Sequence, residues 1–481
     1  MAAASAIWKP LNAERKEIRL LFLEPAISLD ETIRGTLKIA SLLHSPVYEA
    51  VSYCWGDAND TTEILLHDWQ TAITINLASA LRRLRHSTEQ RVLWVDAVCI
   101  DQSDPAERGR QVGTMGDIFS EAVKVNVWLG EADPVFAPGH AFDHMKNVAQ
   151  GKERGFHTEE VNDDQLLRCL YGIFGRPWFG RLWVVQETVL AKTHEYVCGP
   201  YRCPGDVVLG FMQVVNDSPC ALGNDNATAT DPRTMQFIYL RKIMSDVLSI
   251  RSAASMALER RSAYALMQVS RQFGCTEPRD RVYATLSLTN LFSQAKIDYS
   301  KPTEVVYMDA AVAFLHQLDS LELLLWACLE GLPEKGLSVP SWVPDWNTRT
   351  SLVSTRPDFW PVHAWAAFDA SAGVPVNVRV ETHSKALIIP TRIVDAIRLA
   401  GPKWQPSRGL FIQGMQRRLA FLDEWRSFLQ ASPETFWHTI TRGVWRTGEL
   451  VRYRRLSPAD CAYMEDAFHE RRPFFESGER G

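Results

Sequence analysis

The 481-residue sequence contains no apolar run of the roughly 18 residues that a membrane-spanning helix requires. Its first residues lack a basic stretch followed by an apolar core, so no signal peptide is expected. The P-loop, GxGxxG, GxSxG and HExxH motifs are also missing, which excludes the NTPases, dinucleotide-binding folds, serine hydrolases and zinc proteases that they mark. We therefore expect a cytoplasmic protein with no stable membrane anchor.

Cysteine clusters and excess positive charge are missing as well. The 9 cysteines are scattered, and the pair Cys198 and Cys203 in "CGPYRC" has no second Cys or His pair at zinc-finger spacing. We expect free thiols in a reducing compartment and no metal site. The formal net charge of -5 argues against a general nucleic-acid binder, so no nucleic-acid partner is expected.

The first 200 or so residues alternate strand and helix patterns, as in α/β folds. Residues 91–100 are almost continuously apolar, which is typical of a parallel strand covered on both faces. Asp104, Pro105 and Glu107 predict a helix start with a capping box, and Asn76 is a plausible N-cap of an earlier helix. The pattern predicts a doubly wound parallel sheet with right-handed crossovers.

The length predicts two to three domains, divided by composition. We expect the α/β domain at residues 1–204 and a polar linker or long loop at 205–232. A helical region follows at 233–350. The C-terminal region, 351–481, is expected to contain a β-hairpin at 374–390 and basic helices.

Ligands of parallel α/β sheets bind beyond the carboxyl ends of the strands. Those ends carry "SYCWGD", "CIDQSD" and "WLGEAD" here. Gly56 and Asp57 permit a close approach of ligand to backbone, or form an ordinary turn. Asp101 and Gln102 are candidates for contacts to ribose hydroxyls or for turn duties. Trp55, Trp94 and Trp128 all fit a core position better than a stacking platform, and Trp55 is the best candidate for stacking because it lies at the turn.

Three further polar positions have two interpretations each. Asp96 lies within an apolar run, so it needs a partner, either the "SYCWG" turn or an Arg, unless it contacts a ligand directly. Arg108 and Arg110 open the helix after "DQSDPAE", where they would meet phosphates or face solvent.

Glu187 and Trp183 lie four residues apart on a helix predicted at 181–191, and therefore on one side of it. Leu182, Val185 and Val189 form the core-facing stripe of that helix. We therefore expect Glu187 outside the main core, as a catalytic carboxylate, as a solvated side chain, or paired with Arg181 or Lys192.

Four blocks, in order, resemble the heterokaryon incompatibility (HET) domain of filamentous fungi. They are "YEAVSYCWGD" at 48–57, "LWVDAVCIDQSDPAERGRQVGTM" at 93–115, "IFSEAVKVNVWLG" at 118–130 and "RPWFGRLWVVQE" at 176–187. Segments at 277–288, 297–307 and 340–347 look like those that often follow this domain. The resemblance implies a role in non-self recognition and regulated cell death.

The HET domain is itself considered a remote relative of TIR domains, which implies a TIR-like (flavodoxin-like) fold. In TIR enzymes the Glu of a Trp-x-x-x-Glu stretch cleaves the nicotinamide–ribose bond of NAD, and the matching residues are Glu187 and Trp183. Val184 departs from the Cys common there. NAD is then the substrate, with no other cofactor. The expected substrate contacts are Tyr53, Trp55, Gly56, Asp57, Asp96, Asp101, Gln102 and Trp183.

Two mechanisms remain open at this point. In the first, the domain hydrolyses NAD. In the second, it is a non-enzymatic death-signalling or regulatory module that acts by self-assembly or partner binding. Both predict self-association, because related TIR domains work when clustered. Since no P-loop supplies a nucleotide switch, we expect the trigger to come from an unidentified protein partner or from the C-terminal half of the chain.

Overall fold

The computed structural model describes residues 7–153, 164–217, 232–255, 269–286, 297–318 and 338–347, together with shorter stretches of the chain. Contacts divide the chain into two units. The first comprises Met1–Pro219, Gln236–Leu318 and Glu322–Arg349, and the second comprises Cys220–Met235, Asp319–Leu321 and Thr350–Gly481. Residues 236–318, from the predicted helical region, therefore belong to the same unit as the N-terminal sheet.

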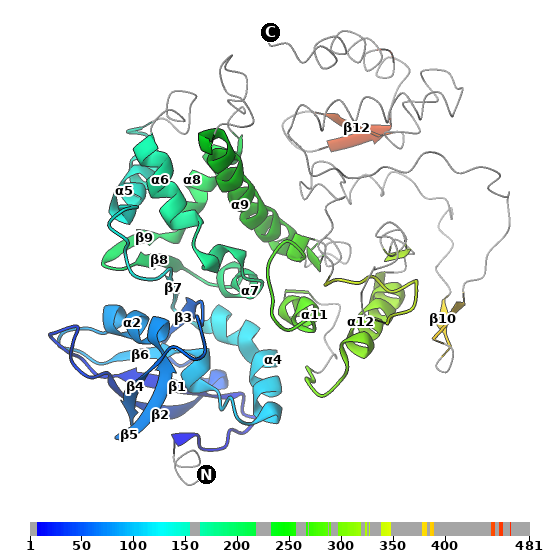
Figure 1. Ribbon diagram of the computed structural model, residues 1–481. Coiled ribbons are helices and arrows are strands. Elements are labelled where there is room, and N and C mark those ends of the chain that lie inside the picture. The colour runs from blue at the N-terminus through cyan, green and yellow to red at the C-terminus, as the bar shows by residue number, and fades with distance from the viewer. Residues whose placement is uncertain are drawn as a thin grey trace. The chain divides into compact units, whose positions relative to one another are not determined.

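The first unit is built around a nine-stranded mixed sheet with the order β5-β4-β2-β1-β6-β3-β7-β8-β9 (Figure 1). Its strands are β1 (Glu17–Leu23), β2 (Arg34–Ser41), β3 (Glu49–Tyr53), β4 (Thr61–Leu66), β5 (Trp69–Thr74), β6 (Arg91–Trp94), β7 (Lys124–Trp128), β8 (His194–Cys198) and β9 (Tyr201–Pro204). A mixed α/β fold with a large N-terminal sheet is thus confirmed.

The prediction of a parallel sheet holds for the centre and for the β2–β4 pair, and is wrong for the other pairs. Strands β6, β3, β7 and β8 are parallel neighbours. The pairs β1–β2, β1–β6, β4–β5 and β8–β9 are antiparallel. Parallel strands need a crossover of about a dozen residues or more, whereas short connections return the chain antiparallel. The two-residue turn at His67 and Asp68, with φ of 51° and 64°, joins β4 to β5 in this way.

The described part of the chain also contains helices. They are α2 (Ile75–Leu84), α3 (Asp96–Cys99), α4 (Pro105–Glu121), α5 (Pro138–Ala149), α6 (Asp164–Phe174), α7 (Val184–Val189), α8 (Gly205–Asp217), α9 (Pro232–Ser255), α11 (Asp280–Leu286) and α12 (Thr303–Leu318), with 3-10 turns η1 (Leu42–His44) and η3 (Pro177–Gly180). Helices α5, α6 and α8 pack together beside β8 and β9 (Figure 1). Residues 205–217, expected in a linker or long loop, form α8 because their apolar side chains are buried.

Two helix starts differ in detail from the expectation. Helix α2 is capped by Thr74, whose hydroxyl accepts from the Leu77 amide at 3.4 Å, and not by Asn76. Helix α4 begins as predicted, with Asp104 accepting from the Ala106 amide at 2.9 Å and Pro105 in the first turn. Glu107 does not complete a capping box, however, because its carboxylate is engaged elsewhere.

Among its described residues, the second unit contains two antiparallel strand pairs. Strands β10 (Arg379–Val380) and β11 (Leu387–Ile388) confirm the hairpin predicted at 374–390. Strands β12 (Val444–Thr447) and β13 (Arg452–Arg455) lie where basic helices were predicted. Most of that prediction falls outside the described residues. Among the described helices of the whole chain, none is long and apolar enough to cross a membrane.

Candidate functional site

Glu187 lies at the carboxyl end of β3. Its carboxylate accepts a hydrogen bond from the Ser52 hydroxyl, and the same hydroxyl accepts from the Trp178 indole at 2.7 Å. Glu187 is 5% exposed, so the expectation that it lies outside the main core is wrong. That expectation assumed an 11-residue amphipathic helix. Helix α7 has only 6 residues and packs against α4 and α11, so both of its sides are covered.

Arg181 brings a positive charge to the same place. Its guanidinium donates to the Tyr53 carbonyl, and its charge acts on both Glu187 and Asp96. Among the described residues, Arg181 forms no direct ion pair with either carboxylate, unlike the Arg181–Glu187 pair considered from the sequence. The alternative pairing of Glu187 with Lys192 is wrong, because the Lys192 ammonium lies 3.5 Å from the Glu121 carboxylate.

Burial has the largest effect on the pKa values of the Glu187 and Asp96 carboxyls. Burial raises the pKa of Glu187 above its ordinary value, and the Arg181 charge and the Ser52 hydrogen bond only partly oppose it. The same balance raises the pKa of Asp96, where burial outweighs its hydrogen bonds and Arg181. Burial and then the neighbouring Asp96 carboxylate raise the pKa of the Tyr53 phenol. The site therefore holds two carboxyls that are harder to ionise than solvated ones.

Asp96 does not lie within a strand, because β6 ends at Trp94 and Asp96 opens the short helix α3. One carboxylate oxygen accepts from the Trp55 indole at 2.8 Å, and the other from the Ala97 amide at 2.7 Å. This confirms that Asp96 bonds the "SYCWG" turn. The residue as a whole is half-buried.

The turn after β3 is the exposed side of the site. Trp55 is 41% exposed, whereas Trp94 and Trp128 are fully buried, as their core interpretation required. Gly56 has a φ of 79°, which L side chains rarely adopt, so the turn itself explains this glycine. Asp57 accepts from the Asn59 amide at 2.9 Å and thus has an ordinary turn role.

Asn76 braces this turn from α2. Its side-chain amide donates to the Cys54 carbonyl at 2.7 Å, and its oxygen accepts from the Trp128 indole at 2.9 Å. The helix therefore connects the ends of β3 and β7. The sequence analysis assigned Asn76 to capping and missed this role.

The side chains of Asp101 and Gln102 form hydrogen bonds to nearby residues of their own loop and of α3. The Asp101 carboxylate accepts from the Ser103 hydroxyl at 2.6 Å, and the Gln102 amide donates to the Asp96 carbonyl at 3.0 Å. Gln102 therefore adjoins the Asp96 end of the site, whereas the Asp101 side chain bonds within the loop.

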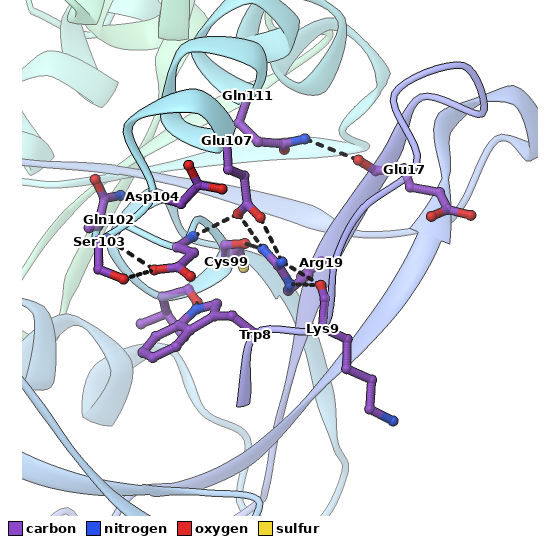
Figure 2. A network of polar contacts seen from close by, with 12 residues as sticks. Trp8, Lys9, Glu17, Arg19, Cys99, Gln102, Ser103, Asp104, Glu107 and Gln111 are labelled. Carbon is purple, nitrogen blue, oxygen red and sulfur yellow. Dashed lines mark hydrogen bonds and ion pairs between the residues drawn. The ribbon is translucent and has the colours of Figure 1, made fainter. Parts of the chain in front are cut away.

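A buried ion pair anchors this loop to the sheet. Figure 2 shows Arg19 of β1 reaching Glu107 of α4, with Nη1–Oε1 and Nη2–Oε2 distances of 2.6 and 2.9 Å. Arg19 also donates to the Cys99 carbonyl at 3.0 Å and to the Lys9 carbonyl. Glu107 accepts from the Asp101 amide at 2.8 Å as well, which is why it forms no capping box.

The two arginines weighed as phosphate ligands have separate surroundings. Arg110 is exposed, as expected of a solvated helix face. Arg108 is half-buried, and its guanidinium lies 4.8 Å from the centre of the Tyr299 ring, so it serves packing.

Trp183 is half-buried, and its indole donates to Asp280 at 2.9 Å. It therefore has a different partner from Glu187, although the spacing placed both on one side of the helix. Within the described residues, no group of three or more His, Cys, Asp and Glu side chains has the proximity to hold a metal ion. The arrangement of Glu187, Asp96 and Arg181 suits charge stabilisation better than metal binding.

Replacing Ser52 with alanine is expected to lower the free energy of unfolding by about 1–3 kcal/mol, because the buried Trp178 indole loses its acceptor. The pKa of Glu187 is expected to rise further, since the Ser52 hydrogen bond lowers it. Urea unfolding measures the first effect. Ser120→Ala on α4 is the control, because its hydroxyl bonds only the exposed end of its own helix, and it is expected to change stability by less than about 0.5 kcal/mol.

Comparison with known proteins gives one family and one relative. The family described as "Heterokaryon incompatibility protein (HET)" matches residues 48–187, a range that begins at Tyr48 and ends at Glu187. The chain is 28% identical over 412 residues to "Heterokaryon incompatibility protein 6, OR allele" of Neurospora crassa, which covers 72% of this chain. The chain spans 60% of the length of that relative. No solved structure matches.

Proposed function

We propose that this protein, whose residues 48–187 match the heterokaryon incompatibility family, acts in fungal non-self recognition, and that the matched region hydrolyses NAD at the nicotinamide–ribose bond. The observation that carries the hydrolase proposal is the position of Glu187. Its carboxylate lies at the carboxyl end of β3, where α/β sheets place their ligands, next to Arg181 and Asp96.

Hydrolysis of this bond requires few catalytic groups from the protein. The bond between C1′ of the ribose and the ring nitrogen breaks, and nicotinamide leaves as a neutral ring with the bonding electrons. The ribose is left as an oxocarbenium-like cation, to which water adds with loss of a proton to solvent. An ionised Glu187 stabilises this cation, and the effect is larger in a buried site than in water.

Three residues near Glu187, namely Trp55, Asp96 and Arg181, are suited to assist the reaction. Trp55 offers an exposed ring at the rim, and the half-buried Asp96 accepts a hydrogen bond from the Trp55 indole. The Arg181 charge acts on both carboxylates, and Arg181 has no direct ion pair in the described part of the chain, so its remaining donors suit an anionic part of the dinucleotide. A TIR-like ancestry agrees with this placement and is part of the proposal.

A second candidate function is a non-enzymatic death-signalling or regulatory module that acts by self-assembly or partner binding. The observation in its favour is that Glu187 is 5% exposed and already bonded to Ser52, so its carboxylate has a structural role without any substrate. In that case the trigger and the partner act on other surfaces.

The test uses purified full-length protein, free and clustered on a scaffold, incubated with NAD while free nicotinamide is followed by chromatography. The hydrolase proposal expects nicotinamide release that is greater for the clustered protein. Cell killing by clustered protein without any release would exclude the hydrolase and favour the assembly module.

A further inference from the structure

Helix α7 is held at both ends by residues that come later in the chain than the matched domain. At its start, the Gly274 amide donates to the Gly180 carbonyl at 2.6 Å, and the Leu182 amide donates to the Gly274 carbonyl at 2.9 Å. At its end, Arg251 of α9 donates to the Thr188 carbonyl at 2.9 Å. Because α7 has only 6 residues, its orientation depends on these tertiary contacts more than on its own hydrogen bonds.

Asp280 supplies the side-chain contact. It opens α11, is 9% exposed, and uses both carboxylate oxygens. One accepts from the Trp183 indole at 2.9 Å and the other from the Tyr299 hydroxyl at 2.8 Å. A single buried carboxylate therefore joins α7, α11 and the segment at 297–301.

That segment is itself fixed against α4. The Arg108 guanidinium lies 4.8 Å from the centre of the Tyr299 ring, and a Cβ added at Gly109 would lie 3.2 Å from the Ile297 carbonyl oxygen. From the other side, Arg279 donates to the carbonyls of Tyr299 and Lys301. Asp280 thus ties α7 to a well-packed support.

The charge state of Asp280 suits this role. Burial raises its pKa to about 6, while the hydrogen bonds from Trp183 and Tyr299 oppose the rise. At neutral pH the carboxylate is ionised, so both oxygens accept. An amide at this position loses the charge and can hold Tyr299 only by reversing that hydrogen bond, so both contacts weaken.

We propose that Asp280 is a positioning residue for Glu187, because its hydrogen bond to Trp183 fixes the helix that presses Glu187 against Ser52. Residues 274–286 and 297–301 then help to form the site, although the matched domain ends at Glu187. The contact is a property of the fold, and its effect on turnover rests on the proposed NAD hydrolysis.

The test compares hydrogen exchange of full-length wild type, Asp280→Asn and Trp183→Phe by mass spectrometry. Asp309→Asn is the matched control, because Asp309 pairs with Lys301 at 2.8 Å on the surface and touches neither Trp183 nor Tyr299. Peptides covering residues 182–190 are expected to exchange at least about tenfold faster in both site variants and at the wild-type rate in the control. Wild-type exchange of these peptides in Asp280→Asn would overturn the proposal.

Nicotinamide release by the clustered proteins is measured in parallel. If NAD hydrolysis occurs, kcat of Asp280→Asn is expected to fall by about tenfold with KM for NAD unchanged, since Asp280 touches no substrate. An equal fall in Trp183→Phe, with no further loss in the double variant, places the two residues on one path. If the wild type releases no nicotinamide, the hydrolase fails, while hydrogen exchange still decides the role of Asp280.

Discussion

Replacing Arg19 with methionine is expected to lower the free energy of unfolding by about 3–5 kcal/mol, the cost of leaving one charge of a buried pair without its partner. The Arg19 and Glu107 side chains are 1% and 6% exposed, so water cannot replace the lost guanidinium. The carbonyls of Lys9 and Cys99 lose a donor in the same step. Urea unfolding followed by tryptophan fluorescence measures the effect.

The exposed pair of Lys16 and Asp117 is the control for this prediction. It is equally short at 2.6 Å, but both side chains are 50% exposed. Lys16→Met is therefore expected to cost less than about 1 kcal/mol. The double change Arg19→Met with Glu107→Leu removes both charges and is expected to be milder than Arg19→Met alone. A loss for Arg19→Met no larger than that for Lys16→Met would contradict the assigned role of the pair.

Glu187→Gln is expected to lower nicotinamide release by about 100-fold or more while the protein stays folded, because a preorganised charge is lost at the developing cation. The amide oxygen still accepts from the Ser52 hydroxyl, so the variant keeps the hydrogen bond that Glu187 makes. Glu187→Ala removes this acceptor too and is expected to be less stable than Glu187→Gln.

The pH dependence follows from the raised pKa of Glu187. Stabilising the cation needs the ionised form, so turnover is expected to rise with pH through a limb that lies above the ordinary Glu value of 4.5. The contribution of the Glu187 carboxyl to folding stability decreases as the pH rises, opposite to turnover. A carboxyl whose pKa is raised on folding stabilises the fold fully below its unfolded pKa, and this contribution is lost as the pH rises through the folded pKa. At neutral pH, Glu187→Gln is therefore expected to unfold no more easily than the wild type.

Local signals carried the predictions that the structure confirms. The apolar runs of β3 and β7, the Asp104–Pro105 start of α4 and the hairpin within 374–390 each depend on a few neighbouring residues. The polar turn at the end of β3 was likewise located from sequence, whereas the turn after β6 was placed too late, because β6 ends at Trp94 and Asp96–Cys99 form α3. Periodicity and caps are properties of short segments, so one sequence suffices to find them.

Partners distant in the sequence left no such signal. Ser52 and Glu187 are 135 positions apart, and Arg19 and Glu107 are 88 apart, so no spacing rule connects them. Arg19 in the otherwise apolar stretch "EIRLLFL" is the one hint, because a buried charge requires a partner. The β4–β5 hairpin escaped prediction for a local reason, since its turn uses His67 and Asp68 at positive φ where Gly or Asn is usual.

The most direct test of the central claim, that the Glu187 carboxylate performs the chemistry, is free nicotinamide released from NAD by clustered Glu187→Gln, with the thermal midpoint measured on the same preparation. The account predicts release by the wild type and almost none by the variant, at thermal midpoints that match. Release by a folded Glu187→Gln at the wild-type rate would contradict it.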